Sequence, residues 1–460
     1  MPVQSDRLVL ALSYQLSAIY HSNTIANIMH SAMLIKLFRQ TAVPVEYRSN
    51  FLHLYLDIGW FGVLSGSAIN FLNIYATRIG ATVFQIGLIG AMSAIVSLFL
   101  AIPAGRWLQT QHTGKAIFWT SVFYRLGFLS FIFLPWLFDE QGQIWAIIAV
   151  TFLMAIPLTG LGLGFNALFA EAVPTEYRAH VAGVRNVVLS VAFVLTSLVS
   201  GYILDQTAFP AGYQIVFGIG FIGAAMSSLH LYFVKPVEAA PAWNENGATD
   251  ASLPPDSVQD KPQPGSAKRT LSALSSLRLD IWRTPFRNVL LGLFGYHLAQ
   301  YLALPVFPLY NVHILKLNDN HIGIGTALFY LTVLFGSTRL SRTVQRLGHK
   351  KVTGLGVAGM AIYPLLLALS SEVWHYYFVS LLGGYIWALA GGAFANYMLE
   401  HIPPDDRPSH LAWYTIILNS AVLIGSLGGP LVADQTGLST SLMLFALLRF
   451  LSGIAILKWG

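Results

Sequence analysis

The residues of this sequence that could do chemistry are charged and polar side chains set inside long apolar segments. Arg125 lies near the middle of one such segment, and Asp57 lies early in another. His297, Gln300 and Tyr301 in a third segment have i, i+3, i+4 spacing, which places them on one face of a helix. If these segments cross a bilayer, a charge at its centre costs roughly 2.5–3.5 kcal/mol, so Arg125 must face protein or water.

Each of these residues has a functional and a structural interpretation, and the sequence leaves both open. Arg125 could meet a substrate anion or pair with an internal acid. Asp57 could be a coupling carboxylate, or it could simply meet the positive N-terminus of its helix. His297 could carry a proton near neutral pH, or it could be a hydrogen-bonded packing residue. Weaker candidates are the amides of Asn70, Asn73, Asn166, Asn396 and Asn419 and the rings of Tyr385 and Trp387, which could stack on a ligand or serve the core.

The elements that must position these side chains are twelve apolar segments. The chain has 460 residues, of which 55% are hydrophobic and 10% charged, whereas soluble domains carry about 25% charged residues. A helical span needs about 20 apolar residues, and the shorter, alternating strands of a membrane barrel do not fit this pattern. We therefore predict an all-α polytopic membrane protein. Its spans centre on residues 53–76, 83–105, 116–137, 144–168, 183–204, 212–234, 286–310, 321–339, 353–371, 375–399, 410–432 and 439–457.

Two stretches lie outside this pattern and divide the chain. Residues 236–284 are rich in Pro, Ser, Ala and charge and have no apolar period, which predicts a disordered linker. It separates a half at residues 51–235 from a half at 285–460. Residues 1–50 hold an apolar stretch that is too short to span, and we expect a cytoplasmic or interfacial extension. A signal peptide, an extra span and a later start at Met29 or Met33 remain open.

The distribution of basic residues predicts the orientation. The net charge is +6, but the Lys and Arg residues are spread through short loops, which argues against nucleic-acid binding. With the N-terminus inside, all of the 26 basic residues except Arg78, Lys316, Arg125 and Arg449 fall at cytoplasmic loops or helix ends. Basic loops are translocated poorly. Both termini and the linker are therefore expected in the cytoplasm, and the protein in the cytoplasmic membrane.

An internal repeat relates the two halves. At an offset of 229 residues, spans four and five fall on spans ten and eleven without a gap. Apolar composition does not explain matches of Glu, Pro, Arg and Asp-Gln-Thr in register. Because six spans lie in each half, both copies have the same orientation, which predicts a parallel repeat about an axis along the membrane normal. The matched pairs are Glu171/Glu400, Pro174/Pro403, Arg178/Arg407, Leu189/Leu418, Ala192/Ala421, Ser197/Ser426, Leu198/Leu427 and Asp205-Gln206-Thr207/Asp434-Gln435-Thr436.

Two further features agree with the repeat. Ile86-Gly87 before span two matches Ile322-Gly323 before span eight, and a short basic loop follows each span. In span eleven, Gly425 and Gly429 place small residues on one face, which favours close helix approach. Asp205 and Asp434 follow spans five and eleven on the outside, where each could cap a turn or make a gate contact.

The chain resembles the major facilitator superfamily over residues 50–460. The resemblance rests on the six-plus-six plan, the linker, the parallel repeat and the loop motifs. The family's loop after span two reads Gly-x-Leu-x-Asp-Arg-x-Gly-Arg-Lys, and the second-half copy here keeps Arg346, Gly348 and Lys350. The acidic position is Gln345, and the first-half copy after Gly105 has no acid. The family's cytoplasmic latch between halves is therefore in doubt.

The Glu-x-x-Pro-x-x-x-Arg loops resemble the family's loops after spans four and ten. Proline directs the chain out of the helix, and the charged residues could pair within the loop or across the halves. A gate contribution and a solvated hairpin both remain open. The residues are Glu171, Pro174 and Arg178 in the first half and Glu400, Pro403 and Arg407 in the second.

The resemblance implies a secondary transporter that moves a small solute by alternating access, without a cofactor or metal. An ion gradient, with a proton carried by Asp57 or His297, or the solute's own gradient would drive it. Its site would lie near mid-membrane between the halves. We expect a monomer in the bilayer and no enzyme activity. The alternatives are a non-transporting sensor on the same fold and, with less support, an integral-membrane glycosyltransferase.

Overall fold

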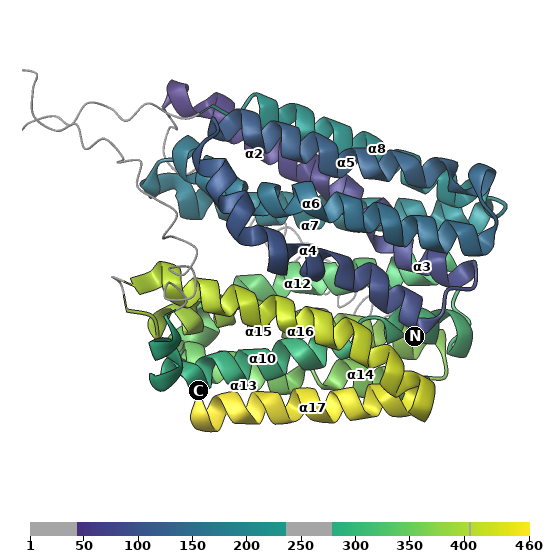
Figure 1. Ribbon diagram of the computed structural model, residues 1–460. Coiled ribbons are helices and arrows are strands. Elements are labelled where there is room, and N and C mark those ends of the chain that lie inside the picture. The colour runs from purple at the N-terminus through teal and green to yellow at the C-terminus, as the bar shows by residue number, and fades with distance from the viewer. Residues whose placement is uncertain (1–43, 236–277, 404–405) are drawn as a thin grey trace, which may run out of the picture.

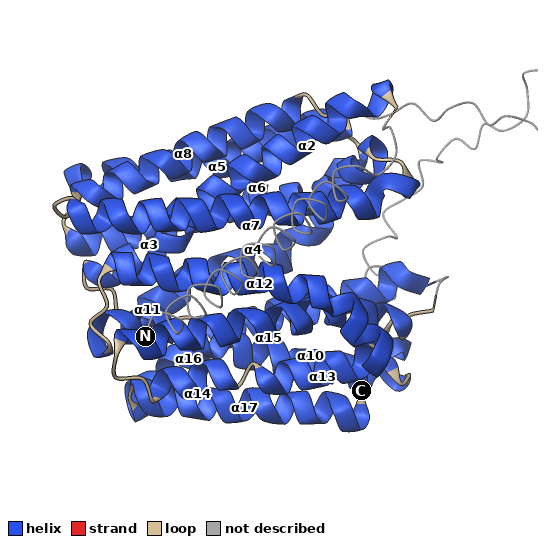
Figure 2. Ribbon diagram, turned by 180° about the vertical axis from the view of Figure 1, so that it is seen from behind, coloured by secondary structure: helices blue, strands red, loops and turns tan. Residues whose placement is uncertain are grey.

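The computed structural model describes residues 44–235, 278–403 and 406–460, and within these ranges it contains helices and no strand. The expected N-terminal extension up to residue 43 and most of the expected linker, residues 236–277, lie outside the described residues. Figure 2 shows the helices as one layered bundle with short loops.

The helices follow the apolar segments in order. The first half contains α2 (Val45–Leu64), the π-helix η1 (Ser65–Ile69), α3 (Asn70–Arg78), α4 (Val83–Gln109), α5 (Thr113–Leu137), α6 (Glu140–Ala172), α7 (Thr175–Gln206) and α8 (Ala211–Tyr232). The second half contains the 3₁₀ helix η2 (Leu279–Arg283), α10 (Phe286–Ala303), α11 (Val306–Leu309), the π-helix η3 (Tyr310–Ile314), α12 (Asp319–Leu347), α13 (His349–Gly359), α14 (Ile362–Ala368), α15 (Val373–Glu400), α16 (Arg407–Thr436) and α17 (Leu438–Trp459).

The predicted helical plan is confirmed. Eleven helical runs in the described part of the chain are long and apolar enough to cross a membrane. The remaining expected span is the helix from Val45 to Arg78, in which α2, η1 and α3 run on with right-handed helical backbone at both junctions. Its first residue, Val45, precedes the expected start, because the helix begins directly after Pro44.

Local sequence explains where two central helices begin. At the start of α4, the Thr82 hydroxyl accepts from the Gln85 amide at 3.2 Å, and the Gln85 side chain accepts from the Thr82 amide at 2.9 Å. At the start of α12, the Asn318 side chain accepts from the His321 amide at 2.8 Å. These side chains satisfy backbone donors that the first turn of a helix leaves free. The matching helices α4 and α12 therefore both begin with a side chain that accepts from the backbone amide three residues later.

The two halves lie side by side, each with its helices along a common direction (Figure 1). We call the end of the molecule that holds Val45, Lys235, Leu279 and Trp459 the linker end. The opposite end, which holds Arg78, is called the Arg78 end. The Asn50 side chain donates to the Lys235 carbonyl at 2.7 Å, which joins the first and last helices of the first half at the linker end.

The halves touch most extensively through two helix pairs, α7 with α12 and α4 with α16, and α3 also meets α11 and η3. A Cβ atom added at Gly323 would lie 2.8 Å from the Ser197 carbonyl oxygen, and one added at Gly87 would lie 2.1 Å from that of Ser426. Only glycine allows backbones to approach so closely. Ser197/Ser426 and Gly87/Gly323 are matched positions in the sequence, so the repeat extends to the contact between the halves.

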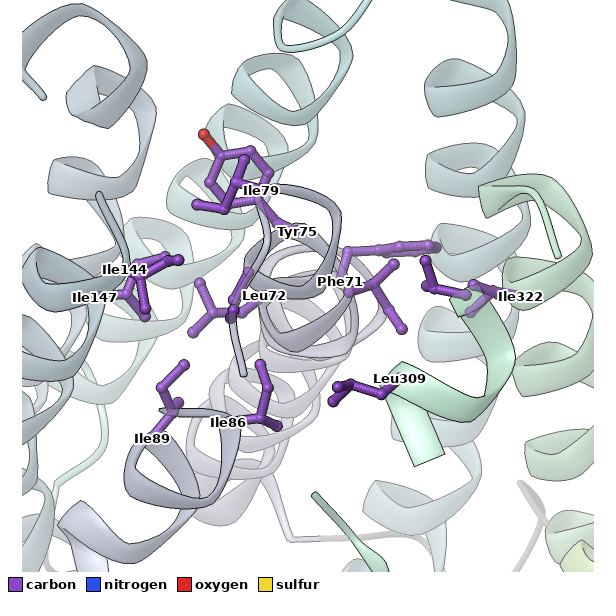
Figure 3. Packing of buried hydrophobic residues seen from close by; sticks show 14 of the residues in the cluster. Phe71, Leu72, Tyr75, Ile79, Ile86, Ile89, Ile144, Ile147, Leu309 and Ile322 are labelled. Carbon is purple, nitrogen blue, oxygen red and sulfur yellow. The ribbon is translucent and has the colours of Figure 1, made fainter. Parts of the chain in front are cut away.

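The buried apolar residues of the described ranges form three clusters, and one of these three joins the halves. That cluster includes Phe71 of α3, Leu309 of α11 and Ile322 of α12, which converge in Figure 3. A second cluster is confined to the second half and a third to the first half around Phe51 and Leu168. One core is therefore shared near the Arg78 end, while each half keeps its own core towards the linker end.

Candidate functional site

A buried ionic cluster lies inside the first half and is centred on Asp57 of α2. This carboxylate is 3% exposed. It accepts from the Ser227 hydroxyl of α8 at 2.5 Å and from Nη1 of Arg185 of α7 at 3.2 Å. Nη2 of Arg125 of α5 lies 3.7 Å from the same carboxylate. The cluster thus ties four helices together in a site shielded from solvent.

Arg125 is held by hydroxyls as well as by Asp57. Its Nη1 donates to Ser121 at 2.7 Å and to Ser228 at 3.0 Å. The sequence left a substrate anion and an internal acid open as partners of Arg125, and the structure places Asp57 beside it. Its Nε has no hydrogen-bond partner.

Arg185 is the functional candidate that sequence reasoning missed. It is only 8% exposed, its Nη1 donates to the Leu54 carbonyl at 2.7 Å, and its guanidinium lies 4.8 Å from the ring centre of Phe165. From the sequence, Arg185 is expected among the basic residues at cytoplasmic helix ends. Its position well inside α7, which begins at Thr175, is the signal that identifies it as buried. Two guanidiniums consequently share the single carboxylate of Asp57.

The polar face predicted in span seven divides between two environments. Nε2 of His297 lies 3.1 Å from the hydroxyl of Tyr414 on α16. Tyr301 also packs on α16, because a Cβ atom added at Gly425 would lie 2.8 Å from the Cβ atom of Tyr301. Gln300 instead lines a cavity of about 220 Å³ within the second half. The close helix approach predicted from Gly425 and Gly429 is confirmed, and the helix that approaches them is α10.

Asn166 joins neither group, because its side chain is exposed on α6. The structure brings Asp57 and Arg125 together in one half and His297 and Gln300 onto one helix of the other. No described contact joins these two sets.

The predicted gate loop after span four is held by contacts within the first half. Arg178 donates from Nη2 to the Ala170 carbonyl at 2.7 Å and from Nε to the Val173 carbonyl at 3.0 Å. Glu171 accepts from the Thr113 hydroxyl at 3.1 Å, and α7 begins directly after Pro174. Arg178 therefore satisfies carbonyls that the end of α6 leaves free.

The matching loop of the second half is arranged differently. Glu400 lies 3.7 Å from Nε2 of His349, the Pro403 carbonyl accepts from the Asp406 amide at 3.1 Å, and Arg407 is exposed. The conserved spacing of Glu, Pro and Arg in the two loops therefore does not give the same contacts.

The remaining loop motif lies at the linker end. Gln345 and Arg346 are exposed in the last turn of α12, and Lys350 is half-buried in α13. Gly348 separates the two helices with a positive φ of 80°, which favours glycine. Gly105 lies within α4 and has open space around it.

Several hydrogen bonds cross between the halves towards the Arg78 end. Nη2 of Arg78 donates to Oδ1 of Asp319 at 3.0 Å and to the Leu317 carbonyl at 2.7 Å. Asn318 donates to Asp205 at 2.8 Å. The Ser197 hydroxyl donates to the Gly323 carbonyl at 3.1 Å. We call this set the Arg78 gate; of the matched aspartates Asp205 and Asp434, Asp205 takes part in it.

Comparison with known proteins agrees with this architecture. The chain is 22% identical over 293 residues to the cis,cis-muconate transport protein of Acinetobacter baylyi, an alignment that covers 63% of this chain and 64% of that protein. The crystal structure of a D-xylose–proton symporter superposes with a TM-score of 0.65 at 16% identity, covering 89% of this chain and 97% of that one. A bacterial homologue of the iron transporter ferroportin in an inward-facing state gives 0.65 at 14%, covering 91% and 99%.

A family assignment rests on the sequence match itself. The sequence model of the Major Facilitator Superfamily matches residues 58–296 and 289–460, which together include all described helices from late α2 onward. The chain belongs to the major facilitator superfamily.

Proposed function

We propose that this protein is a secondary transporter that moves a small solute across the membrane by alternating access. The observation that carries the proposal is the distribution of its buried apolar clusters. The halves share one core towards the Arg78 end and keep separate cores towards the linker end. Two rigid bundles joined at one end can rock about a site between them, which is how such repeats give alternating access.

The proposal places the linker end and both termini in the cytoplasm, in the cytoplasmic membrane. The basic loops that follow α4 and α12 lie at this end, and such loops are translocated poorly. The Arg78 gate would then close the outer face, and the state described here would take up or release solute on the cytoplasmic side. One chain supplies both halves, so we propose a monomer.

The strength of the Arg78 gate suits a reversible closure. The side chains of Arg78 and Asp319 are 26% and 12% exposed. Ion pairs with access to solvent contribute about 0–1 kcal/mol. A gate built from such pairs and from close glycine contacts can open at a cost that solute binding is able to offset.

Counterflow in proteoliposomes tests the transport function. Vesicles that hold the purified protein and are loaded with an unlabelled solute should take up its labelled form faster than protein-free vesicles. Screening solutes by thermal stabilisation selects those to load. Stabilising solutes that never exchange would favour a sensor on the same fold.

The energy source is tested in the same vesicles. A solute accumulated against its gradient in the presence of a proton gradient, and lost when an ionophore collapses that gradient, indicates proton coupling. Equal uptake with and without the ionophore would mean that the solute's own gradient drives movement.

A further inference from the structure

Arg449 of α17 is the most deeply buried charge in the second half. It is 2% exposed and is the largest fully buried side chain of the described residues. Among those residues, no carboxylate lies within 4.0 Å of its guanidinium. Burying an unpaired charge is costly in any protein and more so in a membrane. Something other than an internal acid must therefore compensate it.

Two backbone carbonyls account for only part of its bonding capacity. Nη1 donates to the Met360 carbonyl at 3.2 Å, at the break between α13 and α14, and Nη2 reaches the Ala299 carbonyl at 3.4 Å. A guanidinium carries five N–H donors. Its Nε is buried and has no hydrogen-bond partner. Arg449 thus supports the helix break and still holds unused donors.

The cavity of about 220 Å³ is lined by Arg449 together with aromatic rings. The walls include Tyr330, Tyr363, Tyr376 and Trp387. Gln300 also lines it, and its buried Oε1 has no hydrogen-bond partner. A cavity of about 150 Å³ is enough for benzene in an engineered protein. This one has room for a six-membered ring with a short polar substituent.

We propose that this cavity binds a small planar organic anion with one carboxylate. The carboxylate would pair with Arg449, whose fork of donors matches its two oxygens. The ring would lie among the aromatic walls, and the amide of Gln300 would meet a polar edge. The inference rests on the proposed transport function, for which it names the class of solute.

The ionic cluster of the first half is a weaker candidate for the same ligand. There Arg125 and Arg185 already share Asp57, and Ser121, Ser228 and Leu54 take further donors. In the second half, the charge of Arg449 is compensated in the described residues only by the carbonyl dipoles of Met360 and Ala299. The anion is therefore assigned to Arg449.

The cavity is also placed to influence the contact between the halves. Tyr330, which lines it, stacks on Phe193 of α7 in the other half with ring centres 3.9 Å apart. A ligand against Tyr330 would therefore adjoin a contact that must change when the halves rock. Binding at this position can bias the transport cycle without touching the Arg78 gate.

Titration of the purified full-length protein with benzoate tests the inference, with benzamide as a neutral probe of the same shape and chloride as a plain anion. We expect saturable benzoate binding by calorimetry, and binding at least about tenfold weaker for benzamide, because a hydrogen bond to a charged group is worth about 1.5–3 kcal/mol. Chloride at equal concentration should not compete. Equal binding of benzamide, or competition by chloride, would overturn the proposal.

Variants assign the binding to this cavity. Arg449→Gln should weaken benzoate binding at least about tenfold and Arg449→Lys less, because the charge remains without the planar fork. Trp387→Leu, which removes one of the aromatic walls, should cost benzoate a few-fold in affinity and keeps the test available if the arginine variants fail to fold. Arg342→Gln removes an exposed charge on α12 and is the control. Unchanged affinity in Arg449→Gln or in Trp387→Leu would contradict the assignment.

Transport and binding fail separately in this design. Benzoate binding that is sensitive to Arg449, without counterflow of labelled benzoate, supports the site and contradicts the transport function. Counterflow of another solute by a protein that does not bind benzoate supports transport and overturns the inferred solute class.

Discussion

The two halves share one helical arrangement but stabilise their buried polar side chains in different ways. In the first half, α2 and α7 are joined by an ion pair between Asp57 and Arg185. In the second half, the matching helices α10 and α16 are joined by a hydrogen bond between His297 and Tyr414. The two buried guanidiniums of the first half share the carboxylate of Asp57, whereas Arg449 in the second half has no carboxylate partner in the described residues. A duplicated fold can thus make one half a self-contained support and leave the other with bonding capacity for a ligand.

The largest expected effect comes from removing the carboxylate that compensates the first half. Asp57→Ala leaves Arg125 and Arg185 buried without a counter-charge and should lower the free energy of unfolding by about 3–5 kcal/mol. Chemical unfolding in mixed micelles measures this.

Two controls sharpen that prediction. Asp57→Ala with Arg185→Leu should recover part of the loss, because one uncompensated charge is gone. Arg449→Leu should cost clearly less than Asp57→Ala, since it leaves no unpaired acid behind. Equal losses for Asp57→Ala and Arg449→Leu would remove the distinction between the halves.

The glycine contacts between the halves should give the next largest effect. Gly87→Ala and Gly323→Ala force a Cβ against the Ser426 and Ser197 carbonyls, and overpacking of this kind costs about 1–3 kcal/mol. The strain is relieved if the halves separate at the Arg78 end and close at the linker end.

Distances between spin labels on Cys residues placed at the exposed positions Gln111 and Gln345 should report that closure, and the chain has no native Cys to remove. Gly183→Ala, which meets no atom within 4 Å, is the matched control. An unaltered distance distribution in both glycine variants would show that these contacts do not hold the closed state.

A smaller effect is expected from the hydrogen-bonded pair His297 and Tyr414 of the second half. Tyr414→Phe removes one hydrogen bond to His297 and should lower stability by about 0.5–1.5 kcal/mol. Unfolding in the same micelles gives the value. A loss as large as that of Asp57→Ala would mean that His297 is charged and that the second half also depends on an ionic pair.

The smallest effect should come from the ion pair of the Arg78 gate. A double-mutant cycle with Arg78→Gln and Asp319→Asn should give a coupling of about 0–1 kcal/mol that decreases with added salt. For the wild type, the two single variants and the double variant, the ratio of open to closed populations in the spin-label distances gives the free-energy difference that enters the cycle. A coupling several times larger, and insensitive to salt, would indicate that the pair is far better shielded than its exposure implies.

Much of the plan was available from sequence because it depends on local patterns. Apolar length identified the spans, and in-register matches such as Ser197 with Ser426 identified the parallel repeat. The cost of a charge in lipid singled out Asp57 and Arg125 as residues needing partners. The resemblance of the loops was less informative, because Arg178 of α7 caps the end of α6 whereas Arg407 is exposed.

Sequence alone determined the helical membrane fold, the related halves and the residues whose burial needs an explanation, because hydropathy and repeats are properties of neighbouring or matched positions. Tertiary structure decided which charges are compensated. Arg185 meets Asp57 across 128 positions of the chain, and Arg449 reaches Ala299 across 150 without reaching an acid. Such pairings depend on helix rotation and packing, which place side chains from distant segments at one depth. The same packing decided that the halves are closed at the Arg78 end.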